Sequence, residues 1–188
     1  MIRTLRTLPL LTCAALALVA CSQSPDPNAR KVVSSCLAVS AADAGTILGG
    51  TFIANRISGD DAPRSICSYN DANNSPVALV ELSKQDEKIK DTAADLASDN
   101  KMVLSSMGGL IKPAVTHPAD GFGAGAFYGN ISPHPGATSV QFFAYMDGYK
   151  LQIVINNPKD FPTGEAQAAK LAQKVDENLK NGNAFNTL

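Results

Sequence analysis

Alternating apolar and polar residues predict β-strands in two blocks of the chain. In the first block, residues 65–70 and 77–83 alternate, with Ala78, Val80 and Leu82 on one face. A weaker strand is predicted at residues 51–57. The second block predicts strands at residues 124–129, 138–146 and 149–155. Asp147-Gly148 separates the last two of these strands and is a dipeptide typical of a tight hairpin.

Apolar residues at helical spacing predict three helices, at residues 40–50, 85–100 and 163–181. Ser40 and Asp43 resemble a capping box at the start of the first helix, and Thr163 is the predicted N-cap of the last. Residues 105–121 keep neither period and predict a long irregular loop. The order of elements predicts an α+β domain: an antiparallel sheet with helices packed on one face, built from two similar α-β-β-β halves.

The N-terminal segment has the pattern of a secretory signal. Arg3 and Arg6 precede a mostly apolar run, residues 8–19, that is too short to span a bilayer as a helix. Leu18-Val19-Ala20-Cys21, which ends this run, resembles the lipobox of bacterial lipoproteins at all four positions. The alternative is an ordinary signal peptide followed by a chance cysteine.

The lipobox resemblance implies that residues 1–20 are removed and that Cys21 carries acyl chains such as palmitate. Several acyl chains hold a protein stably on a lipid bilayer, whereas one holds it weakly. Ser22 follows the cysteine where an aspartate would resemble an inner-membrane retention signal. In a Gram-negative cell the expected location is therefore the periplasmic face of the outer membrane.

Composition divides the remaining chain into a tether and one domain. Residues 22–31 are polar and rich in Ser, Pro, Asp and Asn, so residues 21–31 are expected to form a lipidated cysteine and flexible tether. Residues 32–188 are then a single domain. Loss of the two signal-peptide arginines takes the formal net charge from −1 to −3. No clustered basic face is visible, which argues against nucleic acid as a partner.

The cysteines predict one disulfide. Cys13 leaves with the signal peptide and Cys21 is lipidated, so Cys36 and Cys67 remain in an oxidising compartment. A redox-active or metal-binding pair is the alternative. However, the two cysteines lack CxxC spacing, and zinc would need further ligands.

Residues that could support catalysis are few. His117 and His134 each precede a proline in a predicted loop, and neither an HExxH nor a Gly-x-Ser-x-Gly motif is present. A Ser-His-Asp triad assembled only in the folded chain remains open. We therefore predict no catalytic residues, no bound metal and no cofactor.

A second resemblance spans most of residues 36–180. Cys36-Leu37, Leu48-Gly49, Cys67-Ser68-Tyr69 and the segment 121–123 are similar to the Cys…Leu-Gly…Cys-x-Tyr framework of small cell-envelope lipoproteins of unknown function, which are common in actinobacteria. This resemblance implies an α+β fold and a disulfide. It supplies no catalytic residues.

These features predict a non-catalytic lipoprotein that binds a protein partner, either as an envelope assembly factor or as an inhibitor or immunity protein against a toxic enzyme. The alternative is a carrier of a small apolar ligand. The predicted partner-binding residues are Phe122, near the loop at 105–121, and Gln141, Phe143 and Tyr145 on one face of the hairpin. If a helix covers that face, these hairpin residues belong to the core instead.

Overall fold

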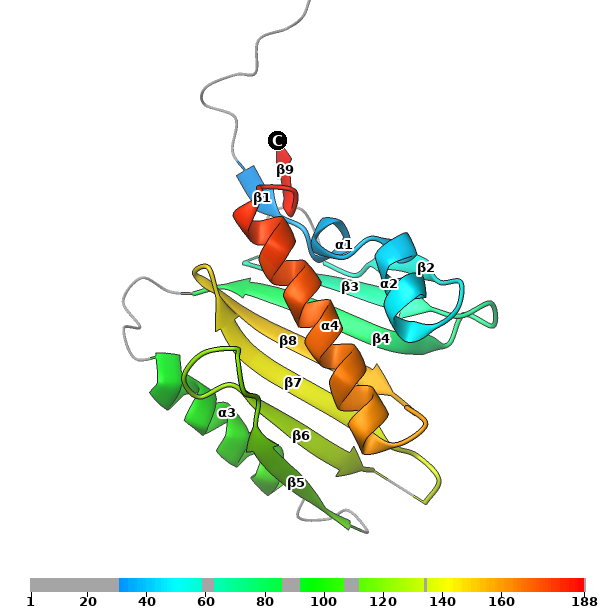
Figure 1. Ribbon diagram of the computed structural model, residues 1–188, viewed down its shortest axis with the longest axis vertical. Helices are drawn as coiled ribbons and strands as arrows, with labels where there is room; N and C mark the ends of the chain where they lie inside the picture. Colours follow the sequence, from blue (N-terminus) through cyan, green and yellow to red (C-terminus); the bar gives the residue numbers. More distant parts are fainter. Residues whose placement is uncertain (1–30, 59–62, 86–91, 107–111, 134, 188) are drawn as a thin grey trace, which may run out of the picture.

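A seven-stranded antiparallel sheet forms the centre of the protein (Figure 1). The computed structural model describes residues 31–58, 63–85, 92–106, 112–133 and 135–187 of the 188-residue chain. The strand order is β2-β3-β4-β8-β7-β6-β5, so two meanders meet where β4 pairs with β8. The strands of this sheet are β2 (Ile53–Arg56), β3 (Arg64–Asn70), β4 (Pro76–Lys84), β5 (Lys112–Pro118), β6 (Phe127–Ser132), β7 (Ser139–Met146) and β8 (Tyr149–Asn156). The predicted α+β fold is confirmed.

The hairpin between β7 and β8 follows the sequence prediction. Asp147 and Gly148 both have positive φ, 47° and 79°, as a two-residue turn of the primed type requires. The side chains of Leu151, Ile153 and Ile155 are buried on one face of β8. Alternation in the sequence therefore identified both the turn and the inward face of this strand.

Strand β5 replaces part of the predicted loop at residues 105–121. His117 pairs with Tyr128 and Thr116 pairs with Gly129, so this segment is an edge strand of the sheet. Pro113 and Pro118 are sequence signals against a strand, so the sequence pattern predicted a loop here. Prolines are tolerated at a sheet edge and at irregularities, and the register of β5 shifts between Lys112 and Val115. The predicted loop was wrong over these residues, while residues 107–111 lie outside the described part of the chain.

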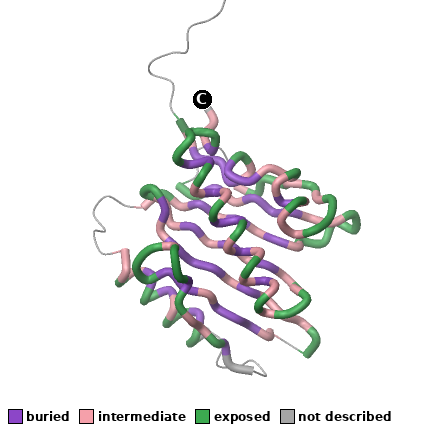
Figure 2. Tube along the Cα trace, in the orientation of Figure 1, coloured by how far each residue is buried: buried purple, intermediate pink, exposed green. Residues whose placement is uncertain are grey.

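Three helices cover one face of the sheet, which we call the front face. They are α1 (Ser35–Ala38), α2 (Ala41–Leu48) and α4 (Phe161–Lys180), and α4 runs diagonally across the sheet in Figure 1. Leu171, Ala172 and Val175 of α4 are fully buried in one large apolar cluster with front-facing strand residues. Figure 2 shows buried segments running along the central strands beneath this helix.

Helix α3 (Thr92–Ser106) lies on the opposite face, which we call the back face. Leu96 and Val103 of α3 form a second, smaller cluster with Phe127 and Phe143. The prediction of helices on one face therefore holds for α1, α2 and α4 but not for α3. Strand β7 carries apolar side chains on both faces, so alternation alone could not show that both would be covered. The predicted start of this helix, at 86–91, lies outside the described residues.

The helix caps agree with the sequence at α2 and differ at α4. Ser40 and Asp43 form the predicted capping box, with the Asp43 N–H 3.1 Å from Ser40 Oγ. At α4 the N-cap is Asp160 rather than Thr163, and the Thr163 N–H donates to Asp160 Oδ1 at 2.7 Å. Pro162 lies in the first turn of α4, where its missing N–H costs nothing, so the helix begins before Thr163.

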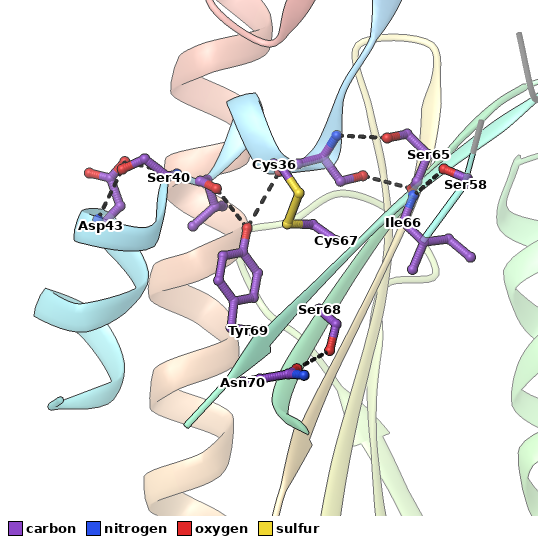
Figure 3. The surroundings of a disulfide bond; sticks show 12 residues. Cys36, Ser40, Asp43, Ser58, Ser65, Ile66, Cys67, Ser68, Tyr69 and Asn70 are labelled. Atoms are coloured by element: carbon purple, nitrogen blue, oxygen red, sulfur yellow. Dashed lines mark hydrogen bonds between the residues drawn. A yellow bond between two sulfur atoms is a disulfide. The ribbon is translucent and has the colours of Figure 1, made fainter. Parts of the chain in front are cut away.

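The predicted disulfide joins Cys36 in α1 to Cys67 in β3, with 5.1 Å between the Cα atoms. Buried hydrogen bonds support the same contact (Figure 3). Ser35 Oγ donates to the Ser65 carbonyl at 2.7 Å, and the Tyr69 hydroxyl donates to the Val39 carbonyl at 2.6 Å. Burial raises the pKa of Tyr69, which keeps its hydroxyl protonated as a donor.

Two short strands outside the main sheet bring the ends of the described chain together. β1 (Lys31–Val33) pairs antiparallel with β9 (Phe185–Thr187), as Figure 1 shows. Strands of three residues carry too little alternation to be predicted. Within the described ranges, no helix is both long and apolar enough to cross a bilayer.

Candidate partner-binding surface

Phe143 is buried, contrary to the expectation that it lies on an open face of the hairpin. Its side chain is 5% exposed and stacks on Phe127 with the ring centroids 4.8 Å apart. Helix α3 covers both rings through Leu96 and Val103. The surface assignment of Phe143 was therefore wrong, because alternation gives the side of a residue but not whether a helix covers that side.

Tyr145 is half-buried and holds α3 against the sheet. Its hydroxyl donates a hydrogen bond to Asp95 Oδ2, and burial together with this carboxylate raises the pKa of Tyr145. One helical turn further along α3, Asp99 Oδ2 lies 2.5 Å from Nζ of Lys150. These two polar contacts orient α3 on the sheet. Tyr145 therefore has a structural role in attaching this helix.

Gln141 and Phe122 complete the predicted set, and the four residues do not converge. Gln141 is half-buried on the back face beside Gly129. Phe122 packs edge-on against Phe142, with ring centroids 5.0 Å apart, in the front cluster. Gln141, Phe143 and Tyr145 therefore lie on the back face, whereas Phe122 lies on the front face.

A polar cluster that the sequence did not reveal connects β5, β6 and α4. His117 Nε2 lies 2.8 Å from Glu165 Oε1, and Asn130 Nδ2 donates to the same oxygen at 2.6 Å. His117 and Glu165 are 48 residues apart, so no local motif could have signalled their contact. The cluster ties the edge strand β5 to α4. In the described segments, no group of three or more His, Cys, Asp or Glu side chains is positioned to hold a metal ion. His134 lies outside them.

A pocket of about 640 Å³ lies between α3 and the segment that joins β5 to β6. Its lining combines polar residues, glycines and apolar residues: Asn100, Thr116, His117, Asp120, Gly121, Gly123, Gly125, Ala97, Pro118, Ala119, Ala126 and Phe127. A carrier of an apolar molecule would be expected to offer a largely apolar wall. The lining of this pocket is mixed, so it does not single out an apolar ligand.

The back face is only partly covered. Helix α3 packs on β5, β6 and β7, while α1, α2 and α4 lie over the front face. Across β2, β3, β4 and β8, the described residues place no helix on the back face. We call this area the open half-face. Its back-facing side chains are Ile53, Asn55, Ile57, Ile66, Ser68, Leu79, Glu81, Gln152 and Val154.

Apolar residues gather on the open half-face in positions that normally carry polar ones. Ile53 and Ile57 are 58% and 60% exposed. Leu79 pairs with Val154 across β4 and β8, and both are half-buried. Ile66 on β3 is also half-buried. Leu79 and Val154 interrupt the polar faces of β4 and β8, and this interruption is a sequence signal that the prediction of the binding residues did not use.

No protein-family model matches the chain, and no curated protein matches it either. The lipobox resemblance and the faint envelope-lipoprotein framework therefore remain predictions.

Proposed function

We propose that the protein is a non-catalytic lipoprotein of the cell envelope that binds a protein partner through the open half-face. The observation that carries this proposal is the apolar group Ile53, Ile57, Ile66, Leu79 and Val154, on a sheet face where none of the helices among the described residues packs. Such surfaces bind partners because contact removes apolar area from water. Polar neighbours such as Asn55 and Gln152 would form the hydrogen-bonding part of the interface.

The lipid anchor is the first part of this proposal. Leu18-Val19-Ala20-Cys21 supports it, and these residues lie outside the described part of the chain. The domain would then stand on the periplasmic face of the outer membrane of a Gram-negative cell, joined to the lipid by residues 21–31. Cys21→Ser should abolish incorporation of a clickable fatty acid in growing cells. Label retained on the variant would contradict the lipoprotein assignment.

The partner is the second part. As an envelope assembly factor, or as an inhibitor or immunity protein against a toxic enzyme, this chain would need a rigid binding surface. The disulfide between Cys36 and Cys67 and the large front cluster support rigidity of the strands that carry the open half-face. Recognition would rest on shape and apolar contact, without chemistry performed by this chain.

The partner-binding proposal is tested by a double variant, Leu79→Gln with Val154→Thr. We expect the full chain to lose proteins that wild type retains from envelope extract, as quantified by mass spectrometry. The matched control is Met102→Gln with Leu104→Gln, which removes apolar side chains that are 57% and 45% exposed on α3. Both variants should keep the wild-type circular dichroism spectrum. An unchanged set of bound proteins with the Leu79/Val154 variant would contradict the proposal.

A small-molecule carrier is the second candidate, and the pocket beside α3 is the observation that favours it. Native mass spectrometry of the protein purified from membranes tests this candidate directly. A bound mass that disappears in Thr116→Phe would support the carrier. If no bound mass is found and the Leu79/Val154 variant loses its protein partner, protein binding is favoured.

A further inference from the structure

Strand β2 is an edge strand with outward-facing main-chain groups. Its pairing with β3 places Ile53 opposite Asn70 and Asn55 opposite Ser68, and the Ile57 N–H donates to the Ile66 carbonyl at 3.0 Å. In an antiparallel ladder, hydrogen-bonded and non-hydrogen-bonded pairs alternate. Ala54 therefore occupies a non-hydrogen-bonded pair, and its N–H and C=O point away from β3.

The two edges of the sheet differ in how they are protected. The edge at β5 carries Pro113, Pro118 and a register irregularity, all of which discourage another strand from pairing there. The edge at β2, Ile53–Arg56, carries no proline and has no such irregularity in its pairing with β3. β2 therefore offers the better surface for strand addition.

The side chains of β2 are arranged symmetrically about Asn55. Ile53 and Ile57 lie two residues before and after it, on the same face, and are 58% and 60% exposed. If a second β2 pairs antiparallel with the two-fold axis at Asn55, Ile53 of each copy faces Ile57 of the other. This register brings both isoleucine pairs together and provides a facing strand for the main-chain groups of Ala54.

We propose that two copies of this chain associate through β2 in that antiparallel register. The two sheets become one continuous sheet, and the two open half-faces become neighbours on a single larger surface. A strand partner is required because only another extended backbone matches the outward N–H and C=O spacing of an edge strand. β2 is short, so the dimer is expected to depend on protein concentration. The inference does not depend on the lipid anchor or on the identity of another protein.

The decisive test is Asn55→Cys in the full chain in detergent. In the proposed register the two residues at position 55 form a non-hydrogen-bonded pair, with Cα atoms about 4.5 Å apart. That separation lies within the usual range for a disulfide. Mild oxidation should give a covalent homodimer on a non-reducing gel. Wild type controls for any thiol at Cys21, and Val115→Cys, at a residue 59% exposed on β5, controls for crowding within a micelle.

A second variant tests the main-chain contact. Ala54→Pro removes an outward N–H without removing a hydrogen bond between β2 and β3. Sedimentation velocity should show a concentration-dependent dimer for wild type and a monomer for this variant, with a similar melting temperature. Three results would overturn the proposal: a wild type that stays monomeric, an Asn55→Cys chain that cross-links no more than Val115→Cys, or cross-linking of Asn55→Cys only to another protein.

Discussion

The front and back faces of the same strands have different roles. On β8, Ile153 points forward and is fully buried beneath α4, whereas its neighbour Val154 points back and is half-buried on the open half-face. On β7, Phe142 lies in the front cluster and Phe143 lies under α3. The front cluster extends across both meanders, while the back cluster is confined to the end of the sheet that α3 covers. The front face therefore holds the larger of the two buried apolar clusters, and the back face carries the proposed partner surface.

Adjacent substitutions on β8 provide the sharpest test of this difference. Ile153→Ala should lower the free energy of unfolding by about 2–5 kcal/mol, because it leaves a cavity in the front cluster. Val154→Ala should cost about 1 kcal/mol or less, because its side chain is only half-buried. Urea unfolding of both variants measures the two losses. Equal losses would show that the back face contributes to the core as much as the front.

The disulfide joins a front-face helix to the sheet, whereas α3 on the back face is attached by noncovalent contacts. Replacing Cys36 and Cys67 together with Ala should lower stability by about 3–4 kcal/mol on the chain-entropy model. Thermal unfolding compares the variant with wild type under oxidising conditions. With excess reductant present, the difference between the two proteins should shrink. A difference that persists at full size after complete reduction would mean that the bond itself is not the source of the loss.

Removing a tyrosine hydroxyl on each side of the sheet compares the polar contacts of the front face with those of the back face. Tyr69→Phe leaves the buried Val39 carbonyl without its 2.6 Å donor and should cost about 1–3 kcal/mol. Tyr145→Phe removes the donor to Asp95 at a half-buried position, where water can replace it, so about 1 kcal/mol or less is expected. Chemical denaturation of the two variants ranks them. The reverse order would indicate that α3 depends on its polar contacts more than on Leu96 and Val103.

The smallest expected effect is a pH dependence at the start of α2, on the front face. The hydrogen bond from the Ser40 hydroxyl, helped by the backbone N–H of Ser40 and the charge of Lys174, lowers the pKa of Asp43. A carboxyl with a lowered pKa in the folded state stabilises the protein above its unfolded pKa, and this contribution is lost as pH falls through the folded pKa. Asp43→Asn should therefore weaken the dependence of melting temperature on pH in the acidic range. Ser40→Ala should do the same, and an unchanged acid profile in both variants would exclude this contribution.

Local features were predicted well from the sequence, whereas the faces of the sheet that helices cover were predicted poorly. The Asp147-Gly148 turn, the inward face of β8 and the Ser40–Asp43 capping box each depend on neighbouring residues, and each was predicted correctly. Strand β5 was missed because its prolines, harmless at an edge, are signals against a strand. Phe143 was placed on the surface because alternation cannot show that α3 folds back over it.

The candidate surface could be predicted only in part, for the same reason. Leu79 and Val154 are visible in the sequence as apolar residues on polar faces, but only the fold shows that they meet across β4 and β8. His117 and Glu165 show no local signal, since the contact depends on where α4 crosses the sheet. Sequence patterns gave the direction of side chains, and the packing of distant elements decided which directions remain open.

The attachment of the first described residues has a mechanical consequence. Tension applied through the chain before Lys31 would first peel β1 from β9 and break the hydrogen bond from the Ser34 N–H to the Ala184 carbonyl, 2.7 Å long. Unravelling would then stop at Cys36, because its covalent bond to Cys67 passes the load directly into β3. The chain thus contains a short extensible segment followed by a fixed stop, so a pull on the N-terminal side would first extend this segment and would then be carried by β3, one of the strands that form the open half-face.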